Sequence, residues 1–249
     1  ASLGWFPSEG LQSVDLFPEG TPAIWGGDGL GGAVALRLGP PGTGTSRLGG
    51  RLGAYGAKRA FGRLASPAAP VAFSLFLDAN TSVEDFTYRD NGGTPFVLED
   101  DQWARRTHNG QSSFSALPQL RVWNRGASYA DLFSFHTVRQ NQIAGPVGAP
   151  LDGDLAQQFH LGAARLFLPL VSGEKWEGLF YGWDQNQDFS APPDQAAFFL
   201  KNSRSVSMGS RWVFSSAETA WGEWEGSVGF HRDWSGLQNG LRTVREGSR

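Results

Sequence analysis

Residues 14–36 read VDLFPEGTPAIWGGDGLGGAVAL, and this stretch indicates the fold of the chain better than any other. Its first four residues are typical of a short strand, and its last four form a second apolar run. Five of the seven residues in 26–32 are glycines, which supply the positive φ that tight turns need. The stretch therefore predicts a strand, a glycine-dense turn and a second strand.

The same glycines have the spacing of a nucleotide-binding motif. Gly27, Gly29 and Gly32 satisfy G-x-G-x-x-G, a fingerprint that needs a helix directly after the glycines to face the pyrophosphate. Only six residues, 33–38, separate Gly32 from Gly39-Pro40-Pro41, too few for that helix. A tight turn between strands is the better interpretation.

The composition favours a β protein with many turns. The 249 residues include 34 Gly, 10 Trp and 18 Phe but no Cys, and the net charge is −3. Without cysteine there is no disulfide or thiolate metal site, and without a basic field we expect no nucleic-acid partner. No apolar run approaches the roughly 20 residues of a membrane helix, and residues 1–5 lack the charged and apolar regions of a signal peptide.

Period-two alternation recurs along the rest of the chain. In residues 71–80 every odd-numbered residue is apolar, so one face of this strand is apolar throughout. The polar Ser74, Asp78 and Asn80 fall on the other face. Similar patterns predict nine strands, near residues 46–56, 58–66, 71–83, 110–123, 128–140, 155–168, 174–187, 202–215 and 219–234.

The predicted connections between these strands alternate in length. Those near 67–70, 124–127, 170–173 and 215–218 are short, whereas those near 84–109, 141–154 and 188–201 are long. Such alternation is typical of transmembrane β-barrels, with short turns at one end and long loops at the other. Tryptophans near both ends predict aromatic belts: Trp123, Trp176, Trp212 and Trp221 by the short turns, and Trp183 and Trp234 toward the long loops.

Residues 11–38 resemble the end of the plug domain of TonB-dependent outer-membrane receptors. In that family a V-E-V-x-x-G strand leads to the run A-L-Y-G-S-G-A-x-G-G-V-I-N-I. The resemblance implies that residues 1–40 are the C-terminal part of a plug domain and residues 41–249 the N-terminal part of the β-barrel. The implied fold is all-β: an antiparallel up-and-down transmembrane barrel segment, about nine strands of a 22-stranded barrel, preceded by the end of a plug. The chain would then begin in mid-plug and be a fragment.

The function that this resemblance implies is TonB-dependent uptake across the outer membrane of a Gram-negative bacterium. The expected cargo is a scarce, bulky nutrient such as a ferric siderophore or cobalamin, although haem, oligosaccharide and peptide receptors share the architecture. The implied partners are this ligand, outer-membrane lipid and the TonB energy-coupling complex, which the family recruits through a TonB box that lies outside this sequence. Where the family has Arg or Lys before the glycine of V-E-V-x-R-G, this chain has Glu19. That departure puts in doubt the salt-bridge lock between plug and barrel wall.

In a barrel the alternation assigns one face to lipid and the other to the lumen. We expect nine apolar side chains to point to lipid: Val71, Phe73, Leu75, Leu77, Phe114, Leu120, Val122, Val228 and Phe230. We expect five polar side chains to point to the lumen: Asp78, Arg121, Glu223, Glu225 and His231.

The long connection at 84–109 holds the best candidates for ligand binding, because aromatic and arginine side chains suit a bulky, often anionic ligand. These candidates are Tyr88, Arg89, Trp103, Arg105 and Arg106. Alternatively, the loop's aromatics pack against one another and its arginines pair with Glu99, Asp100 and Asp101.

Signatures of catalysis are missing from the sequence. It contains no G-x-S-x-G, H-E-x-x-H or P-loop motif, and its four histidines are widely spaced. We therefore expect no catalytic residue, no metal and no cofactor. The other interpretations are a surface or secreted β-structured carbohydrate-binding module, against which the polar faces count, and an outer-membrane barrel enzyme.

Overall fold

The computed structural model describes residues 6–18, 32–43, 45–66, 70–90, 99, 101–123, 127–144, 152–191, 200–217, 222–239 and 242–245. Within them the chain is all-β apart from one short 3₁₀ helix, η2 (Ser8–Gly10). The strands are β1 (Ser13–Phe17), β2 (Ala33–Arg37), β3 (Arg47–Leu52), β4 (Lys58–Ser66), β5 (Val71–Ser82), β6 (Phe86–Asp90), β7 (Gln102–Arg106), β8 (Gln111–Trp123), β9 (Tyr129–Ile143), β10 (Gly153–Pro169), β11 (Lys175–Ser190), β12 (Leu200–Ser215), β13 (Glu225–Asn239) and β14 (Arg242–Arg245).

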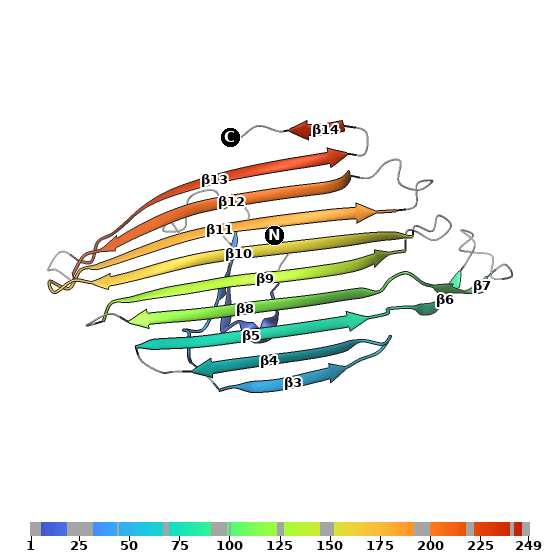
Figure 1. Ribbon diagram of the computed structural model, residues 1–249, viewed down its shortest axis with the longest axis horizontal. Helices are drawn as coiled ribbons and strands as arrows, with labels where there is room; N and C mark the ends of the chain where they lie inside the picture. The colour runs from blue at the N-terminus through green and yellow to red at the C-terminus, as the bar shows by residue number, and fades with distance from the viewer. Residues whose placement is uncertain are drawn as a thin grey trace.

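Ten of these strands form one antiparallel sheet (Figure 1). Its order is β14-β13-β12-β11-β10-β9-β8-β5-β4-β3, so neighbours in the sequence are neighbours in the sheet except where β6 and β7 intervene. Nine of the ten correspond to the predicted strands, and β14 is an addition. The predicted antiparallel, sequential order is confirmed for the described residues. Among them β3 and β14 are the two edges and do not pair with each other.

The last predicted strand begins too early. Residues 219–234 were expected to be a strand, but β13 starts at Glu225. The turn before it is closed between Ser216 and Trp224: the Ser216 N–H donates to the Trp224 carbonyl at 2.8 Å, and the Trp224 N–H donates to the Ser216 hydroxyl at 2.9 Å. Gly222 in this turn has φ of +104°, a value that ends an extended strand.

The two faces of the ten-stranded sheet differ in what covers them. The N-terminal segment, residues 6–18 and 32–43, lies against one face, which we name the inner face (Figure 1). The other is the outer face. Opposed residues of antiparallel strands point the same way, so the register assigns each side chain to a face.

Large apolar side chains gather on the outer face, and each of the following is more than a third exposed: Leu48, Leu52, Leu64, Val71, Phe73, Leu77, Phe114, Val122, Leu132, Val138, Leu168, Trp176, Phe180, Met208, Val228 and Phe230. The nine side chains expected to share one face lie there, whereas Asp78, Arg121, Glu225 and His231 belong to the inner face. Glu223 lies in the turn before β13, so the register assigns it to neither face.

The tryptophans also divide between the faces. Trp176, Trp212 and Trp234 belong to the outer face, as a belt requires. Trp183 belongs to the inner face and packs beside Phe159, and the register of Trp123 with Tyr129 places it on the inner face too. These two cannot be part of an outward belt, and Trp221 lies outside the described residues.

The core of the described residues is small and lies between the inner face and the N-terminal segment. Phe76, Leu117, Phe135 and Phe159 are at most 5% exposed. Phe6 of the N-terminal segment stacks on Phe135, with ring centroids 4.4 Å apart. Aromatic burial of this kind stabilises the contact by more than its area alone, so the core holds the segment on the sheet.

The two strands predicted on either side of the glycine-dense turn pair as expected. β1 and β2 are antiparallel, with Ser13 opposite Arg37 and Phe17 opposite Ala33. Gly32 has φ of +93°, and a Cβ there would lie 2.4 Å from the Phe17 carbonyl oxygen, so no other residue fits. Because a strand and not a helix follows Gly32, the G-x-G-x-x-G spacing does not open a nucleotide-binding unit.

Candidate functional site

The connection from β5 to β8 contains a second hairpin, β6–β7, which forms a separate two-stranded sheet at one end of the main sheet (Figure 1). Two residues near its base, Glu84 and His108, have left-handed backbone angles, with φ of 52° and 62°. This conformation costs an ordinary residue about 1–2 kcal/mol. It redirects the chain, so β6 and β7 do not continue the ladder between β5 and β8.

Hydrogen bonds hold the base of this hairpin in place. The Glu84 carboxylate accepts from the Ser82 hydroxyl at 2.7 Å and from the Gln111 amide at 2.6 Å, which ties together the end of β5 and the start of β8. His108 Nε2 lies 3.0 Å from the Gly153 carbonyl oxygen at the start of β10. The hairpin is therefore attached to the sheet by a defined set of contacts.

The five predicted site residues all lie on β6–β7, but on two faces of it. Register places Arg89 directly opposite Trp103, with Arg105 on the same face two residues further along β7. Tyr88 and Arg106 belong to the other, half-buried face. Thus only three of the five share one exposed surface.

That exposed surface is an indole between two guanidinium groups. Trp103 is 79% exposed, and the Arg89 and Arg105 side chains are 57% and 66% exposed. An exposed aromatic ring with flanking arginines suits stacking of a planar group and forked hydrogen bonds to an oxyanion. This face can contact a ligand without any rearrangement of the hairpin.

The arginines of this hairpin also have partners within the connection. Arg89 Nε lies 2.9 Å from Asp101, and an Arg105 amino group lies 3.4 Å from Asp85. The expected alternative, arginines paired with the loop's own acids, therefore holds for Arg89 and Asp101. Arg105 uses Asp85 instead, and Asp100 lies outside the described residues. Both arginines remain exposed enough to engage a second anion.

A second cluster of charges joins the N-terminal segment to the sheet. Arg59 of β4 donates two hydrogen bonds to the Glu9 carboxylate, at 2.8 and 2.5 Å, and its Nε donates to Asp78 of β5 at 2.7 Å. We name these three residues the Arg59 latch. All three side chains are mostly shielded from solvent.

The latch sets the titration of Glu9. Burial by itself raises the pKa of the Glu9 carboxyl, but hydrogen bonds from Arg59, from the Glu9 backbone N–H and from Ser8 outweigh burial. The net pKa lies below its ordinary value of 4.5. Glu9 is therefore ionised, and its contact with Arg59 is complete, at neutral pH.

The latch is a salt bridge between the N-terminal segment and the sheet, although Glu19 had put such a salt bridge in doubt. Glu19 itself lies outside the described residues. In the latch the N-terminal segment provides the carboxylate and the sheet provides the arginine. Neither Glu9 nor Arg59 stands out in the sequence, because they are 50 positions apart. Only the register of β4 and the position of η2 bring them together.

Three further contacts hold the N-terminal segment through its backbone carbonyls. Arg47 donates to the Glu9 carbonyl at 2.7 Å and Arg63 to the Thr43 carbonyl at 2.9 Å, while Gln119 lies 3.4 Å from the Gly39 carbonyl. These side-chain donors satisfy carbonyls of a segment that has no ladder to the sheet. The inner face supplies these donors.

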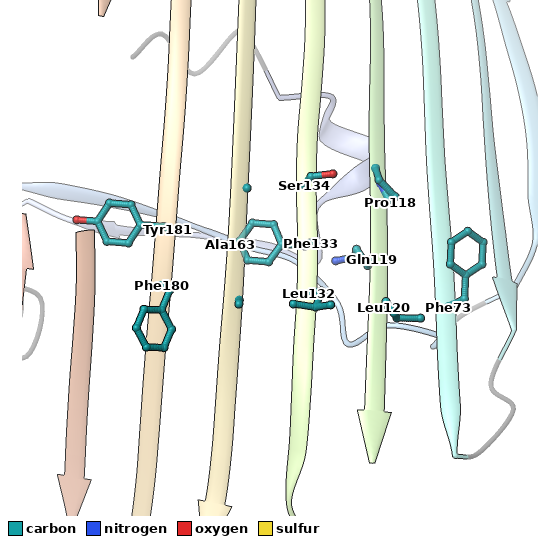
Figure 2. A pocket seen from close by; sticks show the side chains of 12 residues that line it. Phe73, Pro118, Gln119, Leu120, Leu132, Phe133, Ser134, Ala163, Phe180 and Tyr181 are labelled. Atoms are coloured by element: carbon teal, nitrogen blue, oxygen red, sulfur yellow. The ribbon is translucent and has the colours of Figure 1, made fainter. Parts of the chain in front are cut away.

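On the outer face, the middle of the sheet carries an open apolar hollow of about 750 Å³ (Figure 2). Phe73, Leu120, Leu132 and Phe180 project around it, and small residues at its centre leave the space. A row across the strands passes through Pro118, Ser134, Gly162 and Gly182. The hollow has no charged lining residue and is a shallow apolar surface.

A polar row lies beside this hollow on the outer face. His136 and His160 are opposed across β9 and β10, with their Nδ1 atoms 3.0 Å apart, and Asp184 is opposite His160 on β11. Asp184 makes a forked pair with Arg204, at 3.1 and 2.8 Å. On β10 and β11 the outer face therefore becomes polar toward the end that carries β6–β7, whereas Phe114 and Val138 keep it apolar there on β8 and β9.

Among the described residues, no group of three or more His, Cys, Asp or Glu side chains is arranged to hold a metal ion. The described part of the chain also has no helix of the length and apolarity needed to cross a membrane. Comparisons with protein-family models and with curated proteins give no match to this chain.

Proposed function

We propose that this chain is the end of a plug and the first strands of the barrel of a TonB-dependent outer-membrane receptor. In this proposal the protein sits in the outer membrane of a Gram-negative bacterium, takes up a scarce bulky ligand such as a ferric siderophore or cobalamin, and is driven by the TonB complex. Its role is transport and not catalysis.

One observation carries this proposal: the face of the ten-stranded sheet that carries most of the large apolar side chains is the exposed one. The inner face, which holds the small core and the buried polar side chains, is covered by the N-terminal segment, while the outer face with its large apolar side chains is left exposed. Soluble monomers rarely expose more than a few hundred Å² of contiguous apolar surface. Lipid outside and a plug inside account for both faces at once.

The lengths of strands and connections support the same proposal. β9 to β13 have 15 to 17 residues each, longer than the usual limit of about ten in globular proteins. Tilted strands need about 9–11 residues to cross the hydrocarbon layer, so these would extend beyond it. The β6–β7 hairpin lies at the end with long connections, which in such barrels faces the outside.

In this proposal the exposed face of β6–β7 makes first contact with the ligand. Arg89, Trp103 and Arg105 provide the contact, and Tyr88 and Arg106 support the hairpin from its half-buried face. Stacking and forked hydrogen bonds of this kind contribute about 1–3 kcal/mol each when desolvated.

Ligand uptake by cells tests the proposal. The protein with Arg89, Trp103 and Arg105 all changed to alanine should bind and import its ligand at least about tenfold less well, yet assemble normally. A matched control changes Arg211, Trp224 and Arg232, which lie outside the hairpin, to alanine and should leave uptake near the parent value. Uptake that is independent of the TonB complex, or a chain that is stable and monodisperse without detergent or membrane, would contradict the proposal; the second result would favour the carbohydrate-binding module.

A further inference from the structure

Two histidines form a close pair on the outer face, beside the apolar hollow. His136 of β9 and His160 of β10 are directly opposite each other in the register, and both side chains are exposed. Their ring centroids lie 5.2 Å apart at an interplanar angle of 52°, and their Nδ1 atoms are 3.0 Å apart. Because the two residues are 24 positions apart in the sequence, only the pairing of β9 with β10 brings them together.

The two facing nitrogens can share either a proton or a metal ion. Each nitrogen of an imidazole carries a proton or a lone pair, and two bare lone pairs repel each other at this distance. His136 Nε2 lies 3.1 Å from the Ser134 hydroxyl. A proton on that Nε2, donated to Ser134, leaves the Nδ1 of the neutral His136 ring with a lone pair. A proton on His160 Nδ1 fills the gap between the rings, and a metal ion fills it equally well.

The separation of the two nitrogens matches two neighbouring ligands of one metal ion. Bonds from histidine nitrogen to a metal are about 2.0–2.1 Å long. Two such bonds at a right angle place the nitrogens about 2.9 Å apart, and two at the tetrahedral angle place them about 3.3 Å apart. The observed 3.0 Å is closer to the right angle, which square-planar and tetragonal ions such as copper(II) prefer.

The outer face leaves room for the rest of a coordination shell. Ser134 and Gly162 are opposite each other in the next row across β9 and β10, and a Cβ placed on Gly162 would meet no atom within 4 Å. Water can therefore reach the space beside the pair. The contact of His136 with Ser134 orients the His136 ring, as a partner on the second ring nitrogen does in metal sites generally.

The carboxylate next to the pair has a partner of its own. Asp184 is opposite His160 on β11, but its two oxygens accept from Arg204 at 3.1 and 2.8 Å. The two imidazoles are therefore the protein ligands, and water completes the shell. This agrees with the finding that no larger group of His, Cys, Asp or Glu side chains in the described residues is arranged to hold a metal.

We propose that His136 and His160 bind one divalent transition-metal ion through their Nδ1 atoms, with copper(II) preferred over zinc(II). Imidazole suits both metals, and copper(II) is bound more tightly than zinc(II) by sites of this kind. The ion takes the place of the proton between the neutral rings, and that proton moves through solvent to His160 Nε2, so each ring donates one lone pair. The inference goes beyond the proposed transport function and does not rest on it.

Titration of the detergent-purified protein with copper(II), prepared without a polyhistidine tag, tests the site by calorimetry and electron paramagnetic resonance. One ion should bind with the spectrum of two imidazole nitrogens. Loss of an outer-shell partner alone costs about 10–100-fold in metal affinity, so His136→Ala and His160→Ala should each weaken binding by more than about tenfold. The double variant should lose little more than either single variant. His231→Ala, which removes a histidine of the inner face, should leave the affinity unchanged.

Three results would overturn the site: copper(II) does not bind, only one of the two histidines affects binding, or His231→Ala weakens binding as much as His160→Ala. Tighter binding of zinc(II) than of copper(II) would overturn the preference drawn from the right-angle geometry. If an alanine variant fails to assemble, His160→Asn repeats the test with a polar side chain. These outcomes are separable from the uptake experiment, because the titration needs neither the TonB complex nor the hairpin surface.

Discussion

At the level of single residues, Arg59 makes the contacts on which the position of the N-terminal segment most depends. Changing Arg59 to alanine removes the partner of Glu9 and leaves the mostly buried Asp78 without its cation. Hydrogen bonds to charged groups contribute about 1.5–3 kcal/mol. We expect hydrogen exchange in residues 6–18, measured by mass spectrometry, to accelerate by the factor that corresponds to this loss of free energy.

Arg51 provides the control for this change, because it is opposite Arg59 but has no acidic partner among the described residues. Arg51→Ala should leave exchange in residues 6–18 unchanged. Equal protection in Arg59→Ala and in the parent protein would show that the Phe6–Phe135 stack holds the segment without the latch.

The latch also predicts a dependence on pH. The folded pKa of Glu9 is below its ordinary value of 4.5, so the contact adds stability above about pH 4.5 and loses it as the pH falls through the folded pKa. Protection of residues 6–18, corrected for intrinsic exchange, should be constant from neutral pH down to that region and then decline. Glu9→Gln should remove this step, and a step of the same size in that variant would assign the effect to another group.

At the level of elements, β11 allows the two faces to be compared within one strand. Phe180 points outward and Gln187 belongs to the inner face. An arginine facing lipid costs about 2–4 kcal/mol near the midplane, so Phe180→Arg should hinder assembly in the outer membrane, whereas Gln187→Arg should be tolerated. A heat-modifiability gel measures this difference. In a soluble protein the exposed Phe180 would accept arginine as readily as Gln187 does.

The β6–β7 hairpin predicts a separate effect at its base. Glu84→Ala removes the acceptor for Ser82 and Gln111, which should destabilise the hairpin by about 1–2 kcal/mol. Exchange in residues 86–90 and 102–106 should then accelerate, while β5 and β8 remain protected. Glu84→Gln keeps one acceptor oxygen and should have the smaller effect. Acceleration spread over β5 and β8 would mean that the hairpin is not a separate unit.

The sequence predicted the long elements well because each is decided by a local pattern. The strand expected at 58–66 is β4, and the one expected at 110–123 is β8 with a difference of one residue. β6 and β7 were not predicted as strands, because five residues each inside a long connection give too little alternation to detect. The start of β13 was missed because the Ser216–Trp224 pair that closes its turn depends on the folded structure.

The candidate site was predicted in composition but not in arrangement. Aromatic and arginine residues in the long connection marked the hairpin, yet the split of Tyr88 and Arg106 from Arg89, Trp103 and Arg105 follows from the β6–β7 register. The Arg59 latch could not be predicted, because it joins residues that are distant in the sequence. Its only signal was the placement of arginines at alternate positions of β4, which any polar face shares.

For the whole molecule, the decisive question is whether the outer face of the ten-stranded sheet contacts lipid. The chain contains no cysteine, so single cysteines at Phe73, Phe180, Gln185 and Gln187 can each carry a nitroxide label. Electron paramagnetic resonance then compares collisions with oxygen, which concentrates in lipid, and with a water-soluble nickel chelate. We predict high oxygen and low nickel accessibility at Phe73 and Phe180, and the reverse at the two inner positions of β11. High nickel accessibility at Phe73 and Phe180 in the membrane-reconstituted protein would contradict the membrane assignment.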